Sequence, residues 1–483
     1  MSYFTALNNL SVKKKTVTVN SFFGVNSLKS ERLAGADEAV ECYNFSTRGG
    51  GLTDGDGIEE LTLNGKTFPL PAGVYPQKIY YYPYIEPVTL NKKDKLLVYG
   101  SDGYIYLFEI YDDKERAKLS GATFSSPPSA VPYNYDDTDV LIISGEGEGT
   151  YILKNDVLTP VPDAPDVTSL CVQSERLIVA SPEGNSKLWF SEDFNPENWN
   201  VPFAVTDATT LTEAGYVELY DALGKIKRVV GFNGYAYVFK EYGIYRLYLA
   251  GAQSDFSVSC VLKSGSYIYG DSVTVCGDFI TYMTDDGIYA FNGLSASKIS
   301  GETDAFLRSG GDKSARGEYL DGNLYLLINA KIKGSVKPVI LKYDFYKKRS
   351  EILLMKPFNS ICKILTDDGG IIALSAKNEK RLLKIGGKGL CLNENVEKFY
   401  KSGKLDFNIL QKIKVLKKVK IYSEEEATLI LLSEYGEKSF TLKSGLNELN
   451  AALKGETFTY IIKSDRKNSL ILKPTFYLTY LGD

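Results

Sequence analysis

Apolar residues in this chain alternate with polar ones, or run together in short stretches, and the stretches end at glycine, aspartate or asparagine. Each such unit predicts two strands joined by a tight turn, because short apolar runs bounded by turn residues are typical of β-structure. The unit returns roughly every forty residues, a period that predicts a β-propeller of small antiparallel blades. Seven units begin near Leu96, Val140, Arg176, Val229, Asp278, Tyr319 and Ile364.

The pattern divides the chain into three parts of an all-β protein. Residues 1–73 are rich in glycine, serine and asparagine and predict an extended N-terminal arm that leads into the repeats. Residues 74–386 carry the repeats and predict a propeller of six or seven blades, which closes when its terminal strands complete one blade together. Residues 387–483 carry longer alternating runs that predict a C-terminal β-sandwich. A long loop is expected at residues 191–215, where the interval between units is widest.

Composition agrees with strands and narrows the chemistry. The chain has 483 residues with 35 Tyr and 23 Phe but only 3 Met, and aromatic residues favour strands. Its net charge of −4 argues against a dominant nucleic-acid-binding surface, which needs concentrated basic charge. The 6 cysteines contain no CxxC pair and are expected to be reduced and mostly buried in strands. We expect neither a signal peptide nor a membrane span, since no apolar stretch approaches about eighteen residues.

The sequence contains no histidine. This excludes Ser-His and Cys-His nucleophile systems and His-ligated zinc, although glycosidases remain possible because they need only two carboxylates. Glu146 and Glu148 alternate in a glycine-rich run and are such a pair, but a solvated turn of a blade is the favoured interpretation. The nearest match to a sialidase turn, Ser191–Trp199, lacks the glycine and does not recur.

Two further groups of residues have a structural and a functional interpretation. The turn at Asp54–Glu60 offers carboxylates from Asp54, Asp56, Glu59 and Glu60 that suit a cation, but the full calcium-loop pattern is absent and a structural turn is favoured. Lysines gather in one predicted strand, and we expect the polar face of an edge strand there, with an acidic protein partner as the alternative. They are Lys412, Lys414, Lys417, Lys418 and Lys420.

A ladder of tyrosines recurs in the repeats and is interpreted as packing within blades, with a sugar- or protein-binding face as the alternative. Its members are Tyr104, Tyr106, Tyr235, Tyr237, Tyr245, Tyr282 and Tyr289.

Three segments together resemble one family, the propeller-type structural proteins of tailed-bacteriophage virions, which include tail, nozzle and packaged-DNA stabilization proteins. In residues 22–57 the likeness lies in Gly24, Asn26, Asn44 and Gly51. In residues 163–200 an Arg-Leu strand, a Trp-bearing strand ending in Ser and an Asn-Pro-x-x-Trp turn match, although Asn195 stands where the family often has Asp. The matching residues are Arg176, Leu177, Trp189, Ser191, Asn195, Pro196 and Trp199. The third segment, residues 399–423, is similar to the lead-in strand of the family's sandwich and includes Lys412, Lys414 and Lys417.

The resemblance implies a non-enzymatic virion protein without catalytic, cofactor-binding or metal-binding residues. Such proteins assemble in the bacterial host cytoplasm into homo-oligomeric rings of the tail or head-to-tail region. They contact other tail or connector proteins and carry DNA only as passing cargo. A ring requires heterologous interfaces between subunits that close on themselves. A mildly acidic lumen would let DNA pass, because a basic wall would bind its phosphates. The N-terminal arm is expected to clasp a neighbouring subunit.

Two other hypotheses remain open at this point. A carbohydrate-binding or glycan-cleaving tail-tip protein predicts a cluster of aromatic residues and carboxylates at one propeller mouth. A cellular propeller that acts as an interaction hub is the third, although WD-type and kelch-type signatures are missing from the sequence.

Overall fold

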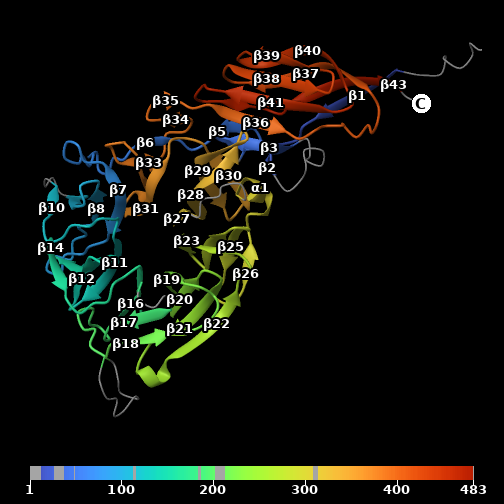
Figure 1. Ribbon diagram of the computed structural model, residues 1–483. Coiled ribbons are helices and arrows are strands. Elements are labelled where there is room, and N and C mark those ends of the chain that lie inside the picture. The colour runs from blue at the N-terminus through green and yellow to red at the C-terminus, as the bar shows by residue number, and fades with distance from the viewer. Residues whose placement is uncertain are drawn as a thin grey trace, which may run out of the picture.

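The computed structural model describes residues 12–26, 37–47, 49–111, 116–182, 186–201, 213–307 and 314–481, and it is all-β (Figure 1). Its helical turns are short: η1 (Gln253–Asp255), η2 (Gly301–Thr303) and α1 (Asp304–Leu307). No helix in these ranges has the length and apolar character needed to cross a membrane. Residues 202–212 of the predicted long loop lie outside the described residues.

Seven antiparallel sheets follow one another along the chain, and each is one blade of a propeller. Blades 1 to 3 hold β7 (Pro76–Tyr82), β8 (Lys95–Gly100), β9 (Ile105–Glu109) and β10 (Ala117–Leu119); β11 (Ser129–Tyr135), β12 (Thr138–Gly145), β13 (Gly149–Lys154) and β14 (Val157–Val161); and β15 (Ser169–Gln173), β16 (Arg176–Ala180), β17 (Lys187–Phe190) and β18 (Gly215–Glu218). Blades 4 to 6 hold β19 (Ile226–Phe232), β20 (Tyr235–Lys240), β21 (Gly243–Tyr248) and β22 (Ser257–Lys263); β23 (Ile268–Cys276), β24 (Phe279–Thr284), β25 (Gly287–Phe291) and β26 (Ala296–Lys298); and β27 (Arg316–Leu320), β28 (Asn323–Ile332), β29 (Ser335–Asp344) and β30 (Arg349–Leu353). Each of the seven predicted units falls in a different blade, so the prediction of six or seven blades is confirmed with seven.

The first strands of the blades lie next to the centre, and in several blades the strands behind them are deeply buried. β8 and β16 are buried along their whole length, which explains why they appear in the sequence as continuous apolar runs rather than alternating ones. Apolar clusters fill the spaces between neighbouring blades; between blades 3 and 4 one contains Ile178, Phe190 and Val238. The blades therefore share their cores with their neighbours, as propeller blades must.

The seventh blade closes the propeller with a strand from the N-terminal part of the chain. β31 (Phe358–Thr366), β32 (Gly369–Ala376) and β33 (Leu383–Ile385) are followed in the sheet by β6 (Ile58–Glu60), with Ile58 opposite Ile385. Beyond β6 lie β34 (Leu390–Cys391) and β35 (Glu394–Asn395). The expectation that terminal strands complete one blade together is thus confirmed.

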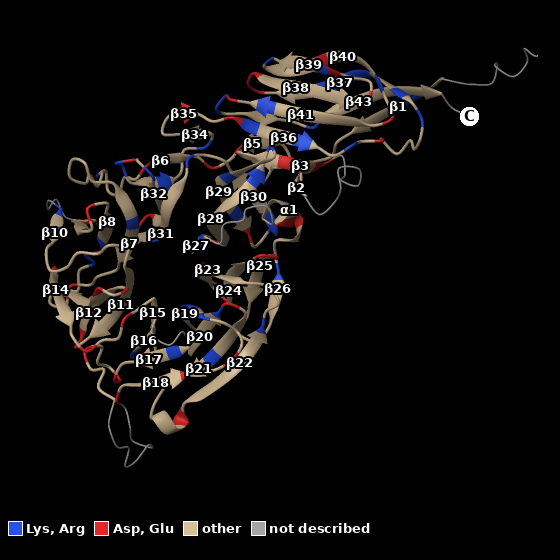
Figure 2. Ribbon diagram, viewed as in Figure 1, with Lys and Arg blue, Asp and Glu red and all other residues tan. Residues whose placement is uncertain are grey.

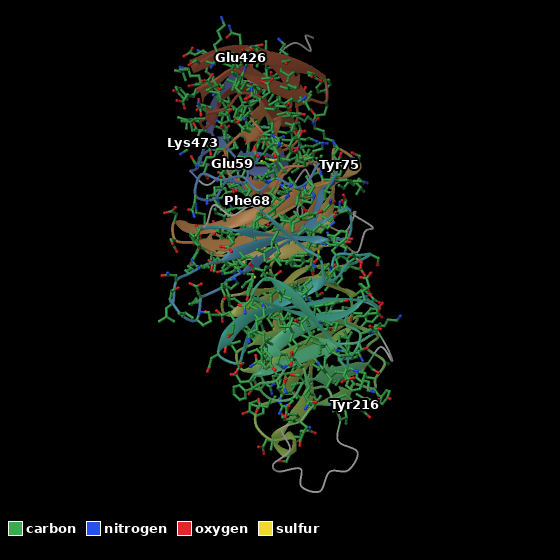
Figure 3. The ribbon with its side chains drawn as sticks, turned by 90° about the vertical axis from the view of Figure 1, so that its left-hand side faces the viewer. Glu59, Phe68, Tyr75, Tyr216, Glu426 and Lys473 are labelled. Carbon is green, nitrogen blue, oxygen red and sulfur yellow. The ribbon has the colours of Figure 1, made fainter. Side chains whose placement is uncertain are left out.

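The predicted C-terminal sandwich is present, and strands from the N-terminus complete both of its sheets. One sheet contains β1 (Val12–Thr18), β43 (Thr475–Leu481), β37 (Lys414–Ser423), β40 (Gly445–Gly455), β42 (Leu470–Ile471), β5 (Leu52–Asp54) and β4 (Phe45–Ser46). The other contains β2 (Gly24–Val25), β3 (Glu38–Tyr43), β36 (Lys398–Ser402), β41 (Phe458–Ser464), β38 (Ala427–Ser433) and β39 (Gly436–Leu442). Figure 3 shows the resulting elongated molecule, with Glu426 and Lys473 of the sandwich at one end and Tyr216 of blade 3 towards the other.

The N-terminal part is therefore not a free arm within the described residues. β1 to β5 lie in the sandwich and β6 lies in the propeller, so the boundary predicted at residue 74 marks only where the blades begin. β1 pairs along its whole length with β43. Sequence periodicity did not reveal these pairings, because they join residues that are hundreds of positions apart.

Candidate functional site

Asn44 lies where the N-terminal chain passes between the propeller and the sandwich. Its side chain donates from Nδ2 to the carbonyls of Leu354 (3.0 Å) and Glu397 (2.8 Å), and its Oδ1 accepts from the amide of Leu354 (2.8 Å). The backbone has a φ of 59°, which asparagine tolerates better than most residues. One buried amide thus connects the end of blade 6 to the start of the sandwich.

Two buried lysines bind the carboxylates of the same N-terminal segment. Lys398 of β36 has no exposed surface and pairs with Asp54 at 2.8 Å, while Asp54 also accepts the amide of Asn468 at 2.6 Å. Lys342 of β29 is buried and pairs with Asp56. Burying an ion pair gives little net stability, but removing one partner leaves a buried charge and is strongly destabilising.

These pairs decide between the two interpretations of the acidic turn. Asp54, Asp56 and Glu59 each point to a different lysine, the last to Lys384 at 3.1 Å. Their oxygens diverge instead of converging on one point, as cation ligands would. The described residues hold no group of three or more Cys, Asp or Glu side chains placed for a metal ion. Ion pairs therefore hold the Asp54–Glu60 turn to both the propeller and the sandwich.

A third contact crosses the same junction at Glu397. Lys333, in the turn between β28 and β29, pairs with Glu397 at 2.8 Å and lies 5.3 Å from the ring centre of Tyr43. Its ammonium holds the pKa of Glu397 below the usual range, while burial raises the pKa of Tyr43 to about 12. Glu397 is therefore ionised and Tyr43 neutral at physiological pH.

Gly24 and Asn26 lie beside this junction, in the short stretch that contains β2. Gly24 has a φ of +87°, and a Cβ there would come 3.3 Å from the hydroxyl of Thr47. Asn26 is buried and donates to Glu38 Oε1 at 3.0 Å. The structure thus gathers Gly24, Asn26 and Asn44 at the propeller–sandwich contact, while residues 27–36 between them lie outside the described residues.

Arg176 fastens blade 3 to blade 4. Its side chain is 0% exposed, and Nη1 donates to the carbonyl of Ser191 at 2.8 Å and Nη2 to that of Gly251 at 3.4 Å. Its guanidinium lies 5.5 Å from the ring centre of Phe190 and 5.4 Å from that of Phe256. Arg176 thus fills the space between blades 3 and 4. This packing explains why β16, an otherwise apolar strand, begins with an arginine.

The tryptophan turn of the same segment is also structural. Trp199 is buried and its indole donates to the carbonyl of Pro196 at 2.9 Å. Trp189 packs against Tyr216 on the outer part of blade 3, with Lys187 4.3 Å from the Trp189 ring centre. Ser191 accepts the amide of Leu177 at 3.0 Å. Arg176, Ser191, Pro196 and Trp199 therefore form one local unit, and Trp189 lies at its exposed side.

The edge-strand interpretation of the lysine cluster is wrong. The cluster lies on β37 or just before it, and β37 pairs with β40 on one side and with β43 on the other. Lys414 is fully buried and donates to the carbonyls of Lys412 and Glu456, while Lys418 and Lys420 both pair with Glu448 of β40. Only Lys417, at a β-bulge, is exposed. β1 and β43 cover the side that the sequence pattern left open.

The remaining candidates behave as packing and turn residues. Glu146 and Glu148 lie in the β12–β13 turn, where Glu148 accepts the amide of Ser125 at 2.6 Å. All seven tyrosines of the ladder lie in or at the ends of blade strands; Tyr282 and Tyr289 are stacked 5.6 Å apart. Sequence reasoning did not identify Lys398 or Glu397, although the third family-like segment begins one residue after Lys398.

Taken as chemistry, the junction is a fastening rather than a reaction centre. Its hydrogen bonds and ion pairs join the N-terminal segment to blade 6, blade 7 and β36, and Asp54, Asp56, Glu59 and Glu397 each pair with a lysine. Figure 2 shows that basic and acidic residues are intermixed over both domains. The arrangement holds two domains in one fixed relation.

Comparison with known proteins gives structural neighbours only. No protein-family model matches the chain. A solved structure of BBS1N in complex with ARL6DN, soaked with mercury, is similar at 11% identity and a TM-score of 0.41, covering 68% of this chain and 96% of that chain. The Pan2 WD40 domain of Neurospora crassa is similar at 12% identity and a TM-score of 0.36, covering 65% and 95%. The identification of a seven-bladed propeller rests on the sheets of this chain.

Proposed function

We propose that this chain is a non-enzymatic structural protein of a tailed-bacteriophage virion, assembled in the host cytoplasm into a homo-oligomeric ring of the tail or head-to-tail region. The observation that carries the proposal is the N-terminal segment shared by both domains. Because β1 to β5 belong to the sandwich and β6 closes the propeller, neither domain is complete without the chain that crosses between them. A subunit whose two domains are fastened together in this way suits an assembly that must keep its shape under mechanical force.

The residues of the family-like segments support the same proposal. Arg176, Asn44 and Trp199 all bind backbone carbonyls of this chain, so their roles are in architecture. A ring of copies requires a heterologous interface, in which two different surfaces of one subunit meet. The two ends of this elongated molecule, sandwich and propeller, provide different surfaces for neighbouring copies and for other tail or connector proteins.

Mass spectrometry of purified tailed particles from the strain that produces this chain tests the proposal. We expect the chain in particles that have been purified through a density gradient, in an amount comparable to other tail proteins. Its absence from particles, while it is abundant in the lysate, contradicts a virion role.

A groove on the propeller favours a second candidate function, glycan binding at the particle surface. A cavity of about 710 Å³ lies between blades 5 and 6 and is lined by Phe279, Tyr319, Phe345 and Tyr346, with the carboxylates of Asp278 and Glu302. Tyr346 is 86% exposed and Phe279 is 40% exposed, so aromatic faces are open to solvent. Aromatic rings with nearby carboxylates can hold a sugar by stacking and hydrogen bonding.

A glycan array separates this candidate from the first. Glycan binding that is lost in Tyr346→Ala but kept in Tyr435→Ala, which removes another exposed tyrosine, from the sandwich, supports the groove. Absence of binding to the array removes this candidate and leaves the structural proposal untouched.

A further inference from the structure

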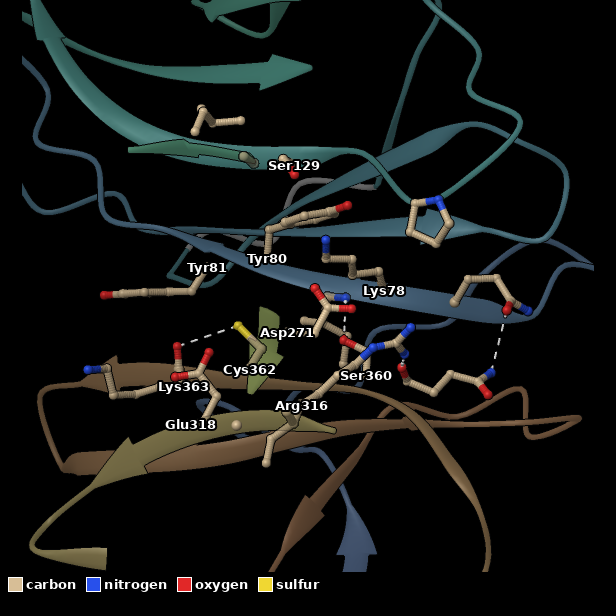
Figure 4. Close-up of a pocket in the computed structure, with 18 of the residues that line it drawn as sticks. Lys78, Tyr80, Tyr81, Ser129, Asp271, Arg316, Glu318, Ser360, Cys362 and Lys363 are labelled. Atoms are coloured by element: carbon tan, nitrogen blue, oxygen red, sulfur yellow. Dashed lines mark hydrogen bonds between the residues drawn. The ribbon is translucent and has the colours of Figure 1, made fainter. Parts of the chain in front are cut away.

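The centre of the propeller contains a cavity of about 450 Å³ that residues from all seven blades line (Figure 4). The first strands β7, β11, β15, β19, β23, β27 and β31 each contribute to its wall. This is the size of a small-molecule pocket. A DNA duplex therefore has no path through it, and any lumen for DNA lies between copies.

The charges of this cavity are opposite in sign to that of the chain. Four cationic side chains line it, Lys78, Arg228, Arg316 and Lys363, against two carboxylates, Asp271 and Glu318. The chain as a whole carries −4. Figure 4 shows Lys78, Asp271, Arg316, Glu318 and Lys363 on strands that face one another across the space.

These cations are not neutralised by ion pairs. Among the described residues, no carboxylate oxygen lies within 4.0 Å, the distance that defines an ion pair, of any of these four cationic groups. Lys78 donates to the carbonyl of Pro128 at 2.9 Å, and Arg316 to that of Asn359, so both are held by neutral groups.

Among the four cationic side chains, Arg228 has a hydrogen-bond donor that is left unsatisfied. Its Nε is buried and has no hydrogen-bond partner among the described residues. A buried donor without a partner costs about 1–3 kcal/mol, and an anion in the cavity would remove that cost. It is the only arginine of β19 and points to a ligand that the protein alone does not supply.

We propose that the central cavity of the propeller binds a small organic or inorganic polyanion, a molecule with two or more carboxylate or phosphate groups, held by Arg228, Arg316, Lys78 and Lys363. A planar guanidinium binds carboxylate or phosphate oxygens in pairs, and the two lysines add point charge. The site is independent of the virion proposal, so each can fail without the other.

The protonation of the wall agrees with this site. Burial, followed by the charge of Arg228, lowers the pKa of Lys78 to about 8, against the opposing charge of Asp271. Burial raises the pKa of Glu318 to about 7, against the opposing charges of Lys363 and Arg228. A bound anion would raise the pKa of both Lys78 and Glu318, because it favours the charged lysine and disfavours the charged carboxylate.

Isothermal titration of the full chain with citrate and, separately, with pyrophosphate at low salt tests the proposal. We expect one site per chain for at least one probe, and weakening of about tenfold or more in Arg228→Gln, the effect of losing one charge-assisted contact. Lys388→Gln, which removes an exposed lysine from a loop outside the cavity, is the matched control and should bind like the parent. The two probes distinguish carboxylate from phosphate chemistry.

The pH dependence provides a second readout. Between about pH 7.5 and pH 9, where citrate already carries its full charge, Lys78 loses its proton and Glu318 completes its ionisation in a wall that also contains Arg228, Arg316, Lys363 and Asp271, so the affinity for citrate should fall. If Arg228→Gln does not fold, Lys363→Gln, from the strand β31, takes its place in the comparison. Absence of binding at millimolar probe, or equal weakening in Lys388→Gln and the cavity variants, overturns the proposal.

Discussion

At the scale of residues, a few buried polar side chains do the work of joining parts of the chain. Asn44 and Arg176 each bind carbonyls from separate elements. The resemblance to phage propellers identified both residues in the sequence, but not their partners. Those partners are 310 to 353 positions away for Asn44, and local patterning carries no information about such distances.

Replacing Asn44 measures how much its side-chain hydrogen bonds contribute to the free energy of unfolding. Asn44→Gly keeps the left-handed backbone accessible and removes three side-chain hydrogen bonds, which should lower the free energy of unfolding by about 3 kcal/mol. Asn64→Gly is the control, because Asn64 also has a positive φ but is exposed with one hydrogen bond of 3.3 Å, and should lose about 0.5 kcal/mol or less. Urea titration followed by circular dichroism gives both values. Equal losses would show that the junction does not depend on Asn44.

Glu318 should make stability depend on pH. Its folded-state pKa of about 7 lies above the ordinary 4.5, so the folded state binds more protons between those values. Stability is therefore fully present below about pH 4.5 and is lost as pH rises through 7. We expect Glu318→Gln to be more stable relative to the parent at pH 7.5 than at pH 5, measured by urea midpoints. A difference that does not change with pH would refute the burial of this carboxyl.

At the scale of elements, the repeat in the sequence predicts the blades well, because each blade is built from neighbours in the chain. Blade 3, for example, follows the apolar run that begins at Arg176. Pairings between distant strands were not predictable: β37 was expected at an edge, whereas β43 and β40 cover both sides of it. The strand β6, only three residues long, shows no alternation of its own and is defined by its partner β33.

The closure of the propeller depends on Gly57, directly before β6. A Cβ at this position would overlap the carbonyl oxygens of Gly387 and Leu390, which are backbone atoms and cannot rotate away. Gly57→Ala should therefore destabilise the protein by about 3 kcal/mol. Gly49→Ala, where a Cβ would have no atom within 4 Å, should change stability by less than about 0.5 kcal/mol. Thermal unfolding of the two variants beside the parent provides the comparison, and a neutral Gly57→Ala would contradict the closure described here.

At the scale of the whole molecule, the two domains share one chain segment and part of one core. The apolar cluster that contains Phe22 and Tyr400 of the sandwich also contains Leu324 and Ile352 of blade 6. Phe22 and Tyr400 meet edge to face at 5.0 Å, although they are far apart in sequence. The sandwich is thus complete only when the N-terminal strands are present.

A fragment that begins at residue 387 tests this dependence. It lacks β1 to β5, so β36, β42 and β43 each lose one of their two partner strands, and Tyr400 loses its contact with Phe22. We expect the fragment to show no cooperative thermal transition under conditions in which the full chain does. A cooperative transition with native-like circular dichroism would show that the sandwich is an autonomous domain.

Electron cryo-microscopy of the purified full chain at high concentration tests whether this interlocked protein is a subunit of a ring. We expect closed rings of identical copies in which two different surfaces of each subunit meet, around a lumen between copies that is wide enough for a DNA duplex. Particles that remain monomers at every concentration, or that form only two-fold dimers without a lumen, would contradict this expectation.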